Sequence, residues 1–243
     1  MALIGVRGAI LVSIIPGLLA ALAIVYAIRQ TRSPTVREHR PVRLRIRPLM
    51  HGSLGRLLAA AAFELGNLAA TLLILRATEL LEPRRSHSSA AQLALVLYAL
   101  YNLAATITSI PAGRLGDRRG MLAILTAGAI CFLAAYIGFA ATGESFALLA
   151  VWFLLAGDGI GAAETAETAA VATLTPERLR GSAFGLLAAV QAAGDLAASV
   201  IARILWSAVS PTAAFLYVAA WMGLAVIGLL TATVTTQRST TPG

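Results

Sequence analysis

The chain of 243 residues contains no lysine and few charged side chains of any kind. Only 12% of its residues are charged, roughly half the share of a soluble domain, whereas 58% are hydrophobic. The single cysteine, Cys131, excludes an intrachain disulfide and argues against a thiolate metal site. The histidines His39, His51 and His87 lie in polar segments and form no ligand cluster. We therefore expect neither a metal site nor a cofactor.

The hydrophobic residues come in long blocks rather than in amphipathic stripes. A helix needs ~20 apolar residues to cross a bilayer, and seven blocks of the chain are about that long or longer. We therefore expect an all-α polytopic membrane protein with seven transmembrane helices. The predicted spans are residues 9–28, 56–77, 90–112, 121–141, 146–171, 183–207 and 212–234.

The basic residues are 19 arginines, which give a net charge of +8. In a soluble protein this excess would indicate nucleic-acid binding. Here the arginines concentrate in the predicted loops, which is typical of the rule that positive charge stays in the cytoplasm. The segments on one predicted side hold thirteen arginines and those on the other hold three. We expect no nucleic-acid partner, a location in the cell (inner) membrane, an N-terminus outside the cell and a cytoplasmic C-terminus.

Eight residues separate the third and fourth spans: Gly113-Arg114-Leu115-Gly116-Asp117-Arg118-Arg119-Gly120. We expect them to form a tight loop, because glycines allow sharp turns. The pattern Gly-x-Leu-x-Asp-Arg-x-Gly strongly resembles the signature loop of the major facilitator superfamily of secondary transporters. The positions that carry this resemblance are Gly113, Leu115, Asp117, Arg118 and Gly120. The sequence departs from the family at Met121, which fits the second, more degenerate copy of the loop between family helices eight and nine.

Two further stretches support the same alignment. Residues 176–185 resemble the start of helix eleven, through Pro176, Arg180, Gly181 and Gly185, and residues 13–19 with the following linker look like helix six and the central loop. The resemblance implies that the spans are helices six to twelve. It implies a single transmembrane helix at 1–28, a cytoplasmic Arg/Pro-rich linker at 29–53, a C-terminal six-helix half at 54–235 and a cytoplasmic tail at 236–243.

Five acids lie within the predicted spans: Glu64, Asp158, Glu164, Glu167 and Asp195. Each costs ~2.5–3.5 kcal/mol at the centre of a membrane unless it faces water, is protonated or is paired. Helical spacing places other polar residues on the same helix faces as some of these acids. We therefore predict a shared, water-accessible pathway for protons or substrate, made of Glu64, Asn67, Asn102, Asp158, Glu164, Glu167, Gln191, Asp195 and Arg203. A purely structural alternative is that Arg203 pairs with an acid to hold the bundle.

Small residues at a spacing of four let membrane helices approach closely. Two such pairs are Gly157 with Gly161 and Gly181 with Gly185. They indicate either packing inside one bundle or a contact between two copies of the chain.

The resemblance implies a proton-coupled antiporter of the plasma membrane that exports small organic solutes by alternating access. Its partners would be the lipid bilayer, the solute, protons, and an N-terminal half or a second copy, with this chain a truncated C-terminal portion. The alternative is a non-transporting membrane module that assembles with another chain. We expect no enzyme, because no nucleophile stands beside a base in the sequence. A retinal photoreceptor is excluded, since its Schiff base needs a lysine.

Overall fold

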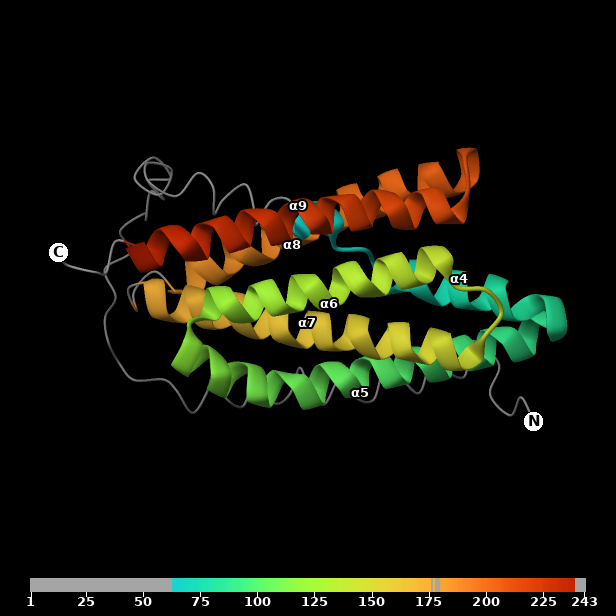
Figure 1. The fold of residues 1–243 in the computed structure, drawn as a ribbon, viewed down its shortest axis with the longest axis horizontal. Helices are drawn as coiled ribbons and strands as arrows, with labels where there is room; N and C mark the ends of the chain where they lie inside the picture. Colours follow the sequence, from blue (N-terminus) through green and yellow to red (C-terminus); the bar gives the residue numbers. More distant parts are fainter. Residues whose placement is uncertain (1–62, 176, 178–179, 239–243) are drawn as a thin grey trace, which may run out of the picture. The chain divides into compact units, whose positions relative to one another are not determined.

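The computed structural model describes residues 63–175, 177 and 180–238, all of which belong to a unit that spans Leu44–Gly243 (Figure 1). These residues form helices and turns, with no strand in the described part. Five of the helices are long and apolar enough to cross a membrane. The all-α polytopic fold is thereby confirmed. The predicted span 9–28, the linker 29–53 and Pro176 lie outside the described residues, so the count of seven spans stays a prediction.

The helices follow the apolar blocks closely. The prediction for 121–141 matches α6 at both ends, and the other long helices extend beyond their apolar blocks by a few residues. Serines mark two of the starts, because Ser86 and Ser145 accept hydrogen bonds from Ser89 N and Leu148 N and so cap α5 and α7. The described elements are α4 (Ala70–Leu81), the 3-10 turn η1 (Glu82–Arg84), α5 (His87–Arg119), α6 (Met121–Ala141), α7 (Phe146–Leu174), α8 (Arg180–Ala208) and α9 (Pro211–Arg238).

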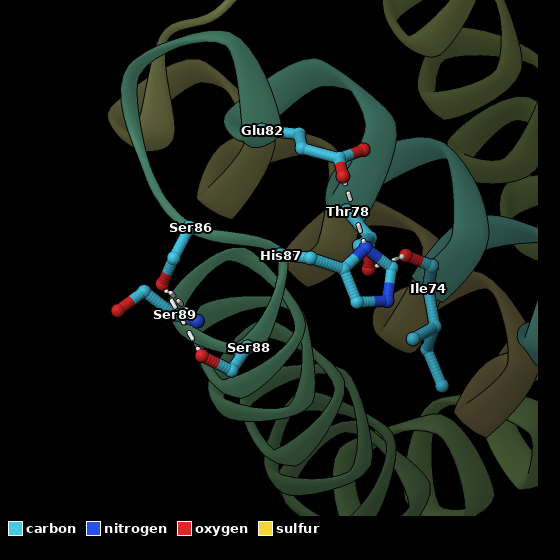
Figure 2. A network of polar contacts seen from close by, with 7 residues as sticks. All are labelled: Ile74, Thr78, Glu82, Ser86, His87, Ser88 and Ser89. Carbon is cyan, nitrogen blue, oxygen red and sulfur yellow. Dashed lines mark hydrogen bonds and ion pairs between the residues drawn. The ribbon is translucent and has the colours of Figure 1, made fainter.

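Side-chain hydrogen bonds stabilise the short turn between α4 and α5 (Figure 2). His87 Nδ1 lies 3.1 Å from Glu82 Oε1, across the turn, and Thr78 Oγ1 donates to the carbonyl of Ile74 in the last part of α4. Arg84 forms a 2.6 Å ion pair with Glu144, which lies between α6 and α7. This ion pair joins two turns of the bundle that are far apart in the sequence.

The expected loop at Gly113–Gly120 is wrong in one respect: most of it is helical. Helix α5 continues to Arg119, and Gly120 alone connects it to α6, with φ 88° and ψ 143°. Leucine and arginine favour helices, and cations in a last turn, here Arg118 and Arg119, interact favourably with the helix dipole. The signature residues before Gly120 therefore lie on the end of a helix.

Helix α7 packs along both α5 and α6, and α9 packs along both α6 and α8. Aromatic side chains fill the centre, where Phe139 contacts Phe153 on α7 and Phe215 on α9. Glycines allow the closest approach between α5 and α7. A Cβ atom added at Gly157 or at Gly161 would overlap the carbonyl oxygens of Tyr101 or Ala105. This small-residue pair therefore serves packing inside the bundle.

Candidate functional site

The predicted span 56–77 is interrupted in its described part. Residues 63–66 are helical, Asn67, Leu68 and Ala69 are not, and α4 begins at Ala70. Gly66 lies against α9 so closely that a Cβ atom there would be 3.0 Å from Met222 N. A continuous helix over the whole span was therefore the wrong expectation, and the break lies where Gly66 and Asn67 replace apolar side chains.

Side chains from other helices satisfy the backbone that this break frees. The N–H of Leu68 donates to Tyr136 Oη on α6 at 3.1 Å, and the N–H of Ala69 donates to Ser199 Oγ on α8 at 3.4 Å. Non-helical backbone at membrane depth needs such partners because no lipid group can replace them. The break is therefore held by two neighbouring helices.

Asn67 connects the break to an acid on α8. Its side-chain Nδ2 donates to Asp195 Oδ1 at 2.9 Å, and both residues are half-buried. The contact uses two of the polar residues that the sequence analysis singled out. It leaves the second carboxylate oxygen of Asp195 able to accept from a proton donor or a ligand.

Two more of the predicted acids line the same cavity. Glu64 is 5% exposed, and its Oε2 has no hydrogen-bond partner in the described part of the chain. Glu167 lies on α7, and its Oε2 accepts a hydrogen bond from Gln191 Nε2 at 2.5 Å. Two acids on the wall of one small cavity disfavour each other's ionisation, because like charges that are close repel.

These groups surround a cavity of about 350 Å³. Its wall combines residues 63–64 and 67–70 with residues from α5, α7 and α8, among them Tyr101, Glu164 and Thr168. Six of the predicted pathway residues line it: Glu64, Asn67, Glu164, Glu167, Gln191 and Asp195.

Three predicted pathway residues lie elsewhere. Asn102 is exposed on α5 and donates to its own helix at Tyr98 O. Asp158 accepts a 2.5 Å hydrogen bond from Thr108 Oγ1 on α5. Arg203 is exposed on α8 and forms no ion pair with any described acid. The predicted pairing of Arg203 with an acid is therefore absent from the described residues.

The remaining predicted positions lie at helix ends. Leu115, Asp117 and Arg118 are exposed on the last turns of α5. Arg180 begins α8, and its Nε donates to Thr175 O at 3.4 Å. None of these residues lines the cavity.

Sequence reasoning missed three parts of the site. Tyr136 and Tyr101 lie in predicted spans, where an aromatic side chain is commonplace, so nothing distinguished them. The break itself had a signal, because a Gly-Asn pair inside an apolar span is unfavourable for a helix. That pair, Gly66 and Asn67, marks the position where the helix stops.

Comparison with known proteins decides the family. The sequence model of the Major Facilitator Superfamily matches residues 53–243, most of the chain. The chain belongs to the major facilitator superfamily. It is 35% identical over 161 residues to an uncharacterized MFS-type transporter of Methanocaldococcus jannaschii, a match that covers 66% of this chain and 40% of that transporter. No solved structure matches the chain.

Membership confirms the family resemblance drawn from Gly113–Gly120. The chain spans about two fifths of the length of the transporter that it matches. Members of the superfamily contact both lipid and small-molecule substrates, and they are not in general enzymes.

Proposed function

We propose that this chain supplies the cavity-bearing part of a proton-coupled secondary transporter that exports small organic solutes by alternating access. One observation carries the proposal: four acids from three helical segments meet in one cavity beside an interrupted helix. Secondary transporters commonly place substrate and ion sites where membrane helices are discontinuous. Charged groups at membrane depth are costly, and they usually mark a transport pathway.

The coupling step is proposed to use the Glu64–Glu167 pair. With one proton held by either acid, the pair carries a single negative charge, and Gln191 holds Glu167 in place. Loss of that proton leaves two like charges together, which favours either reprotonation or the arrival of another partner. Asp195, held by Asn67, is the second group proposed to exchange a proton during the cycle.

The proposed arrangement makes residues 54–235 one six-helix half of the transporter. The other half would come from the same natural protein or from a second copy of this chain. We propose the cell membrane as its location, with the arginine-rich end of α5 in the cytoplasm, because positive residues concentrate on that predicted side. The tail at 236–243 would then also be cytoplasmic.

The test is substrate-driven proton movement. The complete natural protein would be reconstituted into vesicles with a pH-sensitive dye inside, and a panel of cationic, neutral and anionic organic solutes would be added under an imposed pH gradient. At least one solute is expected to move protons. Absence of proton movement with every solute, in vesicles that contain correctly inserted protein, would overturn the proposal.

A substitution then tests the proposed role of Asp195. Asp195→Asn should abolish proton-driven flux but leave membrane insertion unchanged. The matched control is Glu79→Gln, because Glu79 is a half-buried acid on α4 that does not line the cavity and accepts a hydrogen bond from Trp206 Nε1. Unchanged flux in Asp195→Asn would remove Asp195 from the mechanism.

A further inference from the structure

The charge around the cavity is one-sided. Four of its lining residues are acids, Glu64, Glu164, Glu167 and Asp195, and no arginine or histidine of the described chain lines it. The nearby helices do carry arginines, Arg76 on α4 and Arg203 on α8, but neither reaches the cavity wall. The cavity wall therefore carries acidic groups and, among the described residues, no basic group that could pair with them.

The cavity wall also offers more hydrogen-bond acceptors than free donors. Asn67 and Gln191 each donate through their side-chain amides, and both donate to lining acids. Few other donors remain on the wall, chiefly the hydroxyls of Tyr101 and Thr168. A ligand in the cavity therefore meets many acceptors and few donors.

One acceptor is buried and unused. Glu64 lines the cavity, is 95% buried, and has an Oε2 atom without a hydrogen-bond partner among the described residues. Leaving a buried polar atom of this kind unpaired is costly, and more so when the group is charged. This observation is independent of the number of acids, and it points to a donor supplied by a ligand.

We propose that the cavity binds a small organic cation, with its positive group between Glu64 and Glu167 and its apolar part against Phe63 and Tyr101. Aromatic rings attract cations as well as apolar groups. A volume of about 350 Å³ lies at the lower end of the range for small-molecule pockets, so the ligand is small. An anionic solute would meet like charge on the wall with no cation to offset it. This inference rests on the transport role proposed above and names its substrate class.

The preference of the cavity for a cation is tested with three ligands that share a two-ring aromatic skeleton and differ in charge. The purified natural protein would be titrated with N-methyl-para-phenylpyridinium, neutral para-phenylbenzamide and anionic para-phenylbenzoate at neutral pH, by isothermal calorimetry in detergent. The cation is expected to bind at least about tenfold more tightly than the other two, since one unpaired buried charge costs that much or more. Equal or tighter binding of the amide or the benzoate would overturn the proposal.

Substitution of single cavity acids by glutamine shows which carboxylate binds the cation. Glu64→Gln and Glu167→Gln should each weaken cation binding about tenfold or more, with little change for the neutral amide. Glu79→Gln, the same substitution outside the cavity, should leave cation binding unchanged. If Glu64→Gln fails to fold, judged by gel filtration, Glu164→Gln provides the test, because Glu164 is exposed in the cavity. Full cation affinity in every folded lining variant would overturn the assignment.

The two proposals fail in different ways. If the benzoate drives proton movement and the pyridinium neither binds nor moves protons, the cation inference is wrong and the transport proposal stands. If no solute moves protons but the pyridinium binds and depends on Glu64, the transport proposal is wrong and the cavity still selects cations. Competition by sodium alone at equal concentration would assign the site to an inorganic ion and overturn the inference.

Discussion

The hydroxyl of Tyr136 accepts a hydrogen bond from the backbone N–H of Leu68 at 3.1 Å, and this contact fastens the interrupted helix to α6. Tyr136 is fully buried, with its ring stacked on Phe132. Because the ring is held by packing, its hydroxyl is a fixed acceptor for an amide that the helix itself does not use.

Tyr136→Phe is expected to destabilise the protein by ~1–3 kcal/mol, because the buried N–H of Leu68 loses its acceptor. Equilibrium unfolding of the natural protein in detergent mixtures measures the change. Tyr217→Phe is the control, since Tyr217 is half-buried on α9 and packs against Trp221. Equal effects of the two substitutions would contradict a specific role for the Tyr136 hydroxyl.

Asn67 and Asp195 should be energetically coupled. A double-mutant cycle with Asn67→Ala and Asp195→Ala is expected to give a coupling of about 1 kcal/mol, since hydrogen bonds between membrane helices are worth roughly that amount. The same cycle between Asn67 and Asp158 should give no coupling, because Asp158 bonds to Thr108 instead. Additive effects in the first cycle would mean that the 2.9 Å contact contributes nothing to stability.

The two small-residue pairs should respond oppositely to alanine. Gly157→Ala is expected to cost ~1–3 kcal/mol, because its Cβ would overlap the carbonyl of Tyr101. Gly185→Ala meets open space and should be neutral or stabilising by up to ~1 kcal/mol, through better helix propensity. Unfolding measurements on both variants decide the point. A Gly185→Ala variant that loses as much stability would show that this face of α8 is covered in the natural protein.

Gly120→Ala should cost ~1–3 kcal/mol, because φ 88° with an extended ψ is a conformation that only glycine adopts easily. Gly143→Ala is the matched control. Gly143 also lies between two helices, but its φ is not positive and its Cβ would meet no neighbour. If both variants unfold at the same detergent fraction, the turn at Gly120 does not depend on its unusual backbone.

The sequence predicted well what depends on local composition. Helices α5 to α9 follow the apolar blocks because a run of ~20 apolar residues has no other stable form in a bilayer. The family followed from a short pattern around Asp117 and was confirmed by the match over residues 53–243. Six of the nine predicted pathway residues meet in one cavity, because polar side chains inside apolar spans avoid lipid and gather where they can face one another.

What the sequence did not predict depends on contacts between helices. Asp158 has the same chemistry as Asp195, yet it faces α5 and bonds to Thr108, which spacing within one helix cannot reveal. The break after Gly66 depends on the hydroxyls of Tyr136 and Ser199, which are distant in sequence. The glycines at the end of α5 predict a loop, whereas in the structure Gly116 lies within the helix and packs against Met121.

The one-residue connection at Gly120 restricts how the bundle can move. With a single residue between Arg119 and Met121, the adjoining ends of α5 and α6 stay within about 7–8 Å of each other, two steps of the Cα chain. Any separation of these two helices must therefore be a hinge motion about that end, with the far ends of α5 and α6 moving apart. Helix α7 packs along both α5 and α6, so this motion would change its contacts with them. The cavity acids Glu164 and Glu167 flank Thr165, which lies beside Gly113 near the joined end, so these two acids would be displaced least by such a separation.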